Sequence, residues 1–141
     1  MHRFLAPILM LAALQPAPAT GEIEKAFLQG DPKPLRALMA RDGHILMSFP
    51  DPISFSDQLS SQQALLMLRK IFADHATFGF YSEGPFIPPD GNCLILKTRW
   101  SFRDRRNRNP HVFQVFFHLR RNSRAEGRPE WRLTEIKAER L

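Results

Sequence analysis

Histidine side chains are the first candidates for chemistry, because an imidazole can bind a metal ion or transfer a proton near neutral pH. After residue 19 the chain contains four of them: His44, His75, His111 and His118. His111 and His118 are seven residues apart, so on one strand they point to opposite faces and cannot share a metal ion. The single cysteine, Cys93, excludes an internal disulfide and a cysteine-based zinc site. We therefore expect no metal site and no cofactor.

Proton-transfer catalysis would need a carboxylate base and a proton donor in an apolar pocket that adjusts their pKa values. Asp51 lies between two prolines, where turn formation accounts for it. Tyr81, the sole tyrosine, is expected at a sheet edge with its hydroxyl in water. The chain has no phosphate-binding loop, nucleophile elbow or serine, histidine and aspartate arrangement. These residues favour a non-catalytic protein.

Positive charge is concentrated in the C-terminal part of the chain. Residues 20–96 carry 6 Lys and Arg against 9 Asp and Glu, whereas residues 97–141 carry 13 against 5. The predicted anion-binding residues are Lys97, Arg99, Arg103, Arg105, Arg106 and Arg108. They would attract an anionic envelope component such as a polyanion or a membrane surface. The alternative is a solvated sheet face whose arginines cover apolar groups. No motif typical of nucleic-acid binding accompanies the charge, so no nucleic-acid partner is expected.

The first 19 residues are typical of a secretory signal peptide. A basic residue, Arg3, precedes an apolar run from Phe4 to Leu14, and Ala17-Pro18-Ala19 fits the small-residue cleavage pattern. The run is too short to span a bilayer as a helix, which takes about 20 residues. We therefore expect an exported protein, periplasmic or secreted, with no transmembrane anchor after cleavage.

Three helices are predicted ahead of the main sheet. Apolar spacing indicates a helix over residues 22–29 that ends at Gly30. Asp31 can cap a second helix that begins at Pro32. The longest begins at Ser60, which forms a capping box with Gln63.

Strand patterns alternate with a period of two in the rest of the chain. A short strand is predicted over His44–Phe49, and four more follow from Thr77 onward, joined by hairpin loops. Since no crossover helix separates those four strands, their sheet should be antiparallel. Residues 20–141 are thus predicted to form a single α+β domain, with N-terminal helices and one long helix packed on a curved, mainly antiparallel sheet.

Three local motifs join this order of elements: IEKAFLQGD at 23–31, SSQQALLMLRKIFA at 60–73 and WRLTEIK at 131–137. Together they resemble the nuclear transport factor 2-like superfamily, which has a cone-shaped fold shared with cystatin-like proteins. The chain is most similar to a small exported bacterial family of unknown function. The superfamily includes ketosteroid isomerases, polyketide cyclases, dehydratases and non-catalytic binding domains, so the resemblance leaves function open. It also implies a homodimer formed through the outer sheet face.

A candidate pocket for a small apolar ligand lies between the long helix and the sheet. Its predicted lining residues are Phe72, Phe78, Phe80, Trp100, Phe102, Phe117 and His118. The alternatives are plain core packing for the aromatic residues and an outer sheet face for His118. We expect an exported, non-catalytic binding or dimerisation module. The rival functions are an isomerase or dehydratase that acts on a small apolar carbonyl compound, and an envelope-associated polyanion binder.

Overall fold

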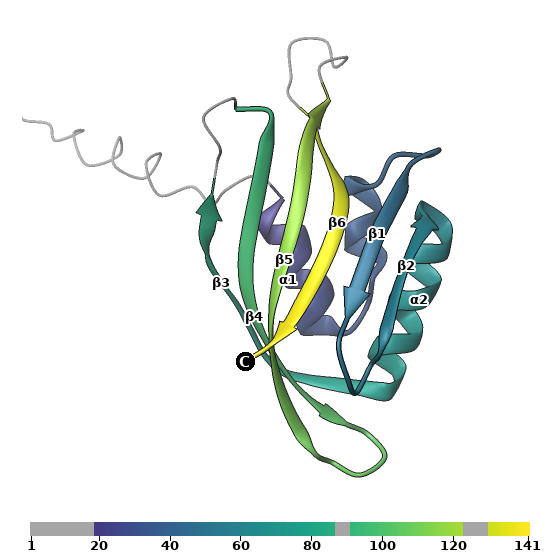
Figure 1. Cartoon of the computed structure of the whole chain (residues 1–141), viewed down its shortest axis with the longest axis vertical. Helices are drawn as coiled ribbons and strands as arrows, with labels where there is room; N and C mark the ends of the chain where they lie inside the picture. Colours follow the sequence, from purple (N-terminus) through teal and green to yellow (C-terminus); the bar gives the residue numbers. More distant parts are fainter. Residues whose placement is uncertain (1–18, 87–90, 123–129) are drawn as a thin grey trace, which may run out of the picture.

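Three helices and six strands make up the residues that the computed structural model describes, which are 19–86, 91–122 and 130–141 (Figure 1). In chain order they are α1 (Thr20–Gln29), the 3-10 helix η2 (Lys33–Leu38), β1 (His44–Phe49), β2 (Phe55–Ser60), α2 (Ser61–Asp74), β3 (His75–Phe86), β4 (Cys93–Asp104), β5 (Pro110–Asn122) and β6 (Glu130–Arg140). This is the predicted α+β class. Apart from its last residue, the predicted signal peptide lies outside the described residues.

Helix α1 ends at the predicted residue, and η2 begins at Lys33, one residue after the predicted Pro32. Gly30 ends α1 with a φ of 66°, and its backbone N–H donates to the carbonyls of Ala26 and Phe27. Glycine adopts this left-handed conformation without a steric penalty. Asp31 Oδ1 then accepts a hydrogen bond from the backbone N–H of Lys33 at 3.0 Å. The second helix is therefore capped as predicted, but it is a short 3-10 helix.

The long helix α2 begins with the predicted capping box. Ser60 Oγ accepts from the backbone N–H of Gln63 at 3.1 Å, and Gln63 Oε1 accepts from the backbone N–H of Ser60 at 3.0 Å. These bonds satisfy donors that a helix N-terminus otherwise leaves free. The buried face of α2 carries Ala64, Leu68, Ile71 and Phe72.

All six strands form one sheet in the order β2-β1-β6-β5-β4-β3. Only the pairing of β1 with β6 is parallel, and the other neighbours are antiparallel. The antiparallel meander over β3–β6 confirms the prediction. Strand β2 was not predicted: it is polar at three successive positions, Ser56, Asp57 and Gln58, and it occupies an exposed sheet edge. Such an edge strand lacks the apolar alternation by which strands are recognised.

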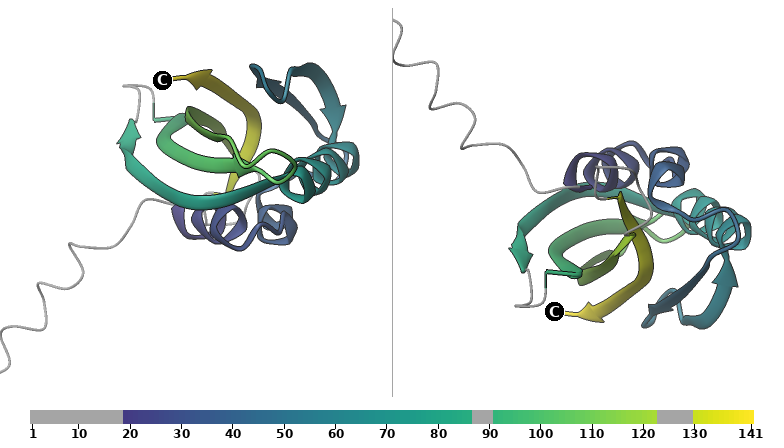
Figure 2. Two further views of the ribbon diagram at one scale, coloured as in Figure 1. Left: turned by 90° about the horizontal axis from the view of Figure 1, so that it is seen from below. Right: turned by 90° about the horizontal axis from the view of Figure 1, so that it is seen from above.

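The sheet is strongly curved, and the helices cover one of its faces (Figures 1 and 2). Helix α1 packs against β3, and α2 packs against β1, β2 and β3. In Figure 1 the helices lie behind the sheet, so the viewer looks at the opposite face of β4, β5 and β6. We call that uncovered side of β3–β6 the outer sheet face.

The core lies between the helices and the inner sheet face, and Phe27 of α1 is at its centre. Its ring stacks on Phe80 with a centroid separation of 4.7 Å. It also meets Phe72, Trp100 and Phe117 edge-on, at 5.0, 5.2 and 5.5 Å. Aromatic rings from two helices and three strands therefore occupy the interior, an arrangement that stabilises beyond simple area burial.

Candidate functional site

Five of the seven predicted pocket residues lie in this aromatic core. Their exposed fractions range from 0% to 6%, and they are Phe72, Phe80, Trp100, Phe102 and Phe117. Trp100 contacts Phe102 with ring centroids 4.2 Å apart, and its indole N–H donates to Thr77 Oγ1 at 2.8 Å. Rings that contact one another this closely act as core packing, the alternative that the sequence left open.

Phe78 does not belong to this interior, which corrects the predicted set. Thr77 pairs with Phe102 and Gly79 with Ser101, so the extra residue between them forms a β-bulge in β3. A bulge shifts the alternation by one residue. Phe78 is consequently 54% exposed, whereas Phe80 is 6% exposed.

His118 also lies outside the interior. On β5 the buried side chains are at odd positions, such as Phe113 and Phe117, so Gln114, Phe116 and His118 face the other way. His118 pairs in register with Ile95 of β4 and Glu135 of β6 on the outer sheet face. The sequence pattern left both faces open for His118, and the structure decides for the outer one.

The polar side chains that are buried among the described residues are Thr20, Ser61, His75 and Thr98. Thr98 Oγ1 donates to the carbonyl of Val115 at 2.9 Å, and Ser61 Oγ donates to the carbonyl of Ala40 at 2.6 Å. These hydroxyls satisfy backbone acceptors. The carboxylate and phenol considered in the sequence are both at the surface: Asp51 is exposed and Tyr81 is 50% exposed.

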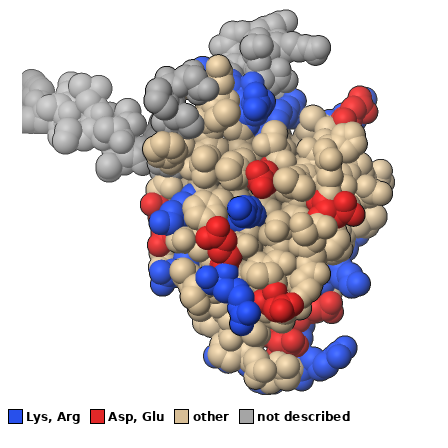
Figure 3. Space-filling view, in the orientation of Figure 1, with Lys and Arg blue, Asp and Glu red and all other residues tan. Residues whose placement is uncertain are grey.

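The outer sheet face has a regular chemical pattern in its cross-strand rows. The first row is Arg99, Gln114 and Glu139; the second is Lys97, Phe116 and Lys137; the third is Ile95, His118 and Glu135. Basic side chains therefore project from β4, and both acidic side chains of these rows project from β6. The space-filling view shows blue and red groups interspersed on this side of the molecule (Figure 3). Glu83 of β3 also reaches this face, where its Oε1 accepts a hydrogen bond from Gln114 Nε2 at 2.8 Å, and Phe116 occupies the middle row of β5.

Arg99 has an unusual environment on this face. Its guanidinium carbon is 5.9 Å from the centroid of the Tyr81 ring. Its Nε is buried, and no acceptor among the described residues hydrogen-bonds to it. Buried polar atoms are seldom left without a partner in native structures.

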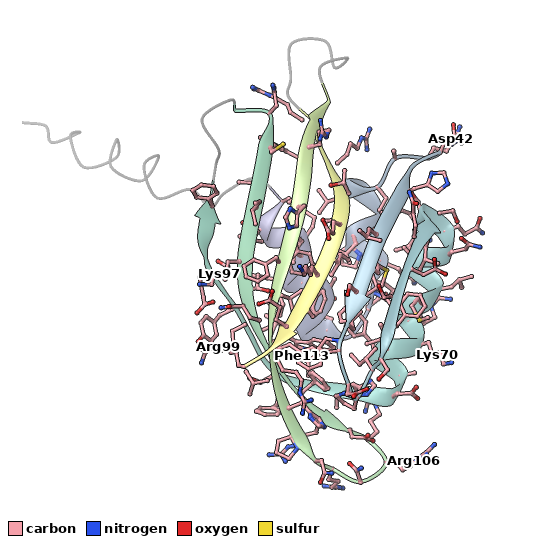
Figure 4. All side chains as sticks on the ribbon, in the orientation of Figure 1. Asp42, Lys70, Lys97, Arg99, Arg106 and Phe113 are labelled. Carbon is pink, nitrogen blue, oxygen red and sulfur yellow. The ribbon has the colours of Figure 1, made fainter. Side chains whose placement is uncertain are left out.

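The structure divides the predicted anion-binding set into two groups. Lys97 and Arg99 lie beside the middle of β4, and Arg106 lies at the end of the β4–β5 hairpin (Figure 4). We call residues 103–108 at that end the hairpin tip. Arg103, Arg105 and Arg108 line one cavity of about 290 Å³ there, together with Ala76 and Asp104.

A second cavity, of about 540 Å³, lies at the same end of the fold. It is lined by Pro52, Asp74, His75, Asp104, Arg105, Arg106 and Asn107. His75 Nδ1 is 3.0 Å from the carbonyl oxygen of Ile71. Because a carbonyl only accepts, Nδ1 of His75 donates this hydrogen bond.

Asp104 is the one carboxyl that both cavities share at this end. The backbone N–H of Arg106 donates to Asp104 Oδ1 at 2.8 Å and holds the pKa of that carboxyl below its ordinary value. Burial opposes this effect and is the second-largest cause, while the backbone N–H of Asn107 and the charges of His75 and Arg106 lower the pKa further. His75 and Asp104 are register partners on β3 and β4. The sequence did not predict this pair, since only the register between the neighbouring strands β3 and β4 brings the two residues together.

Within the described part of the chain, no three His, Cys, Asp or Glu side chains are grouped so that they could hold a metal ion. A search of the same residues for a helix long and apolar enough to cross a membrane found none. The candidate sites are therefore a sheet face and a hairpin tip, both presented at the surface.

The architecture and the location of the core define an NTF2-like fold, as the sequence resemblance implied. A DUF4783 family protein from Bacteroides ovatus is similar over 90% of this chain and 97% of its own, with a TM-score of 0.64 and 16% identity. A ketosteroid isomerase-like protein from Erwinia carotovora atroseptica is similar over 98% of both chains, with a TM-score of 0.65 and 12% identity. An NTF2-like protein from Cytophaga hutchinsonii is similar over 98% of this chain and 100% of its own, with a TM-score of 0.58 and 9% identity.

The sequence itself matches no family model and no curated protein. Likeness at these identities establishes the fold, which supports many different functions. Function must therefore be argued from the surfaces of this chain.

Proposed function

We propose that this chain is an exported, non-catalytic domain that forms a homodimer through its outer sheet face. The carrying observation is the row of Arg99, Gln114 and Glu139, which places opposite charges on the two sides of β5 beside the central Phe116. A two-fold axis that runs along β5 would place β4 of one copy over β6 of the other. Arg99 would then face Glu139 of the second copy, and Phe116 would face its own equivalent.

Such an interface is self-complementary, as two-fold symmetry requires. Phe116 is half-buried and Tyr81 is half-exposed, so both can bury further surface on docking. Aromatic residues and arginine are enriched in protein interfaces. The same axis places Lys97 opposite Lys137 of the second copy, and these two exposed side chains must extend toward water to avoid each other.

The proposal that the domain is non-catalytic rests on the composition of its core. The core positions that would face a substrate in a pocket between α2 and the sheet are aromatic and in mutual contact. Among the described residues, the polar residues that are buried as a whole carry three hydroxyls and one imidazole, and two of those hydroxyls donate to backbone carbonyls. An isomerase or dehydratase would need a base inside an apolar pocket.

Export is proposed from residues 1–19, whose basic head, short apolar run and Ala-Pro-Ala end are typical of a cleaved leader. The protein would then act in the periplasm or outside the cell. Intact-mass measurement after expression in a bacterial host tests this step. A chain that begins at Thr20 supports it, and an unprocessed chain contradicts it.

The dimer is tested by sedimentation equilibrium of the protein as cells process it. Wild type should give a two-chain mass at micromolar concentration. Phe116→Lys adds a positive charge from each copy to a row that already holds Lys97 and Lys137, so it should give a single-chain mass with unchanged far-UV circular dichroism. A single-chain mass for wild type at all concentrations would contradict the proposal.

Leu66→Lys is the matched control. Leu66 is another exposed apolar residue, 56% exposed, but it lies on α2. The same change there should leave the dimer intact. If both variants dissociate, the sheet face is not the specific interface.

A further inference from the structure

The hairpin tip gathers arginines around one cavity, and two of them are held in place. Arg103 lies over the ring of Phe78, with its guanidinium carbon 4.9 Å from the ring centroid, and donates to the carbonyl of Arg108 at 3.4 Å. Arg105 donates through Nε and Nη2 to the carbonyl of Phe72, at 3.4 and 3.3 Å. These contacts leave other guanidinium N–H groups free to bind an anion, because each guanidinium has five.

The backbone of the tip is ordered by its own hydrogen bonds. Asp104 N–H donates to the carbonyl of Asn109 at 3.0 Å, and Arg108 N–H donates to the carbonyl of Asp104 at 2.7 Å. Asn109 N–H also donates to Asn107 Oδ1 at 2.9 Å. The arginines therefore start from fixed backbone positions, which lowers the entropic cost of binding a ligand.

Charge and shape at the cavity suit a phosphate group. Three guanidinium groups and one carboxylate leave the lining with an excess of two positive charges. Arginine binds phosphate oxygens through pairs of parallel N–H bonds. Arg106, next to the cavity, is exposed and adds to the attraction.

Phe78 indicates which kind of molecule carries the phosphate group. The bulge in β3 places its ring at the surface, 54% exposed, in contact with Arg103. A soluble anion would not need an exposed aromatic ring beside the arginines. At a membrane surface, aromatic rings settle among the headgroups while basic residues are attracted to anionic lipid.

We propose that the hairpin tip binds the phosphate groups of anionic lipid headgroups through Arg103, Arg105 and Arg108, with Phe78 inserted at the headgroup level. This binding does not depend on the proposed dimer, since it uses one chain and a different end of the sheet.

The test is cosedimentation with vesicles of phosphatidylglycerol and phosphatidylcholine, compared with phosphatidylcholine alone, for the protein as cells process it. Binding should require phosphatidylglycerol and weaken as salt rises. Every variant carries the same N-terminus as wild type, so differences between variants report on the tip.

Arg103→Gln with Arg108→Gln should weaken binding roughly 30-fold, as expected for two basic residues at an anionic surface. The matched control is Arg120→Gln with Arg121→Gln, which removes the same charge from exposed positions at the other end of β5. The control should change binding less than about threefold. Equal weakening by both pairs would show that only net charge matters and would overturn the proposal, provided that both variants retain the wild-type melting transition.

Two further variants test the proposal. Phe78→Ser tests whether the phosphate belongs to a lipid, and Asp104→Asn tests whether the charge of the cavity controls binding. Phe78→Ser should weaken vesicle binding but leave binding of soluble polyphosphate unchanged. Asp104→Asn keeps an oxygen for the Arg106 N–H and removes a negative charge, so it should strengthen vesicle binding. Polyphosphate binding that exceeds vesicle binding in wild type, or no effect of Phe78→Ser, would overturn the assignment to lipid.

Discussion

Phe116 and Phe117 are neighbours on β5, yet they lie on opposite faces of the sheet. Phe117 is fully buried and meets the Phe27 ring edge-on at 5.5 Å, whereas Phe116 is half-buried between two lysines on the outer face. The inner face is closed by helices and filled with rings, and the outer face carries charges in ordered rows. The same residue type thus supports folding on one face and, in our proposal, association on the other.

The largest difference between the faces should appear in folding stability. Phe117→Ala should lower the free energy of unfolding by about 3–5 kcal/mol, because it leaves a cavity in a closed core. Phe116→Ala should cost less than about 1 kcal/mol, since no packed interior surrounds it. Urea unfolding at protein concentrations too low for association measures both. Equal losses would mean that the two faces do not differ as described.

Exchanging the charges of Arg99 and Glu139 tests whether the outer sheet face is the dimer interface. Arg99→Glu should weaken dimerisation at least about tenfold, equivalent to roughly 1.4 kcal/mol, because it faces like charge across the proposed two-fold axis. Adding Glu139→Arg should restore much of the lost affinity. Sedimentation equilibrium measures both variants. If the double variant dimerises no more tightly than Arg99→Glu alone, Arg99 and Glu139 do not pair across the interface.

Two threonine hydrogen bonds, one inside the fold and one at an exposed hydroxyl, should differ less in their contribution to stability. Thr77→Val removes the acceptor of the Trp100 indole N–H and should cost about 1 kcal/mol, because that donor is then left inside the fold. Thr134→Val removes a bond from an exposed hydroxyl to the carbonyl of His118, and should cost below about 0.5 kcal/mol. The measurement is the unfolding midpoint in urea. A larger loss at Thr134 than at Thr77 would contradict the comparison.

Local chemistry made much of this fold predictable. The Ser60 and Gln63 capping box depends on residues three apart, and the left-handed end of α1 at Gly30 depends on one residue. Alternation along β4 and β5 assigned Trp100 and Phe117 to the side away from the charges. Each of these signals lies within one element, so no tertiary information was needed.

The failures arose where pairing between strands decides the outcome. Phe78 follows the alternation in sequence, and only the bulge opposite β4 turns it outward. Strand β2 has polar side chains and is stabilised by its backbone pairing with β1. His75 and Asp104 are brought together by hairpin register alone. Sequence patterns cannot supply these features, because the partner strand sets them.

The smallest predicted effect concerns Asp104 at the hairpin tip, where the two faces end. Its pKa is lowered in the folded protein, mainly because the carboxylate accepts the Arg106 N–H. The charged form therefore favours folding at pH values above the ordinary Asp pKa of about 3.9, and the contribution disappears as pH falls through the lower folded value. Wild type should exceed Asp104→Asn in urea midpoint slightly at pH 7 and match it near pH 2. A difference between wild type and Asp104→Asn that grows as pH falls would reverse the sign and show that the carboxylate disfavours the folded tip.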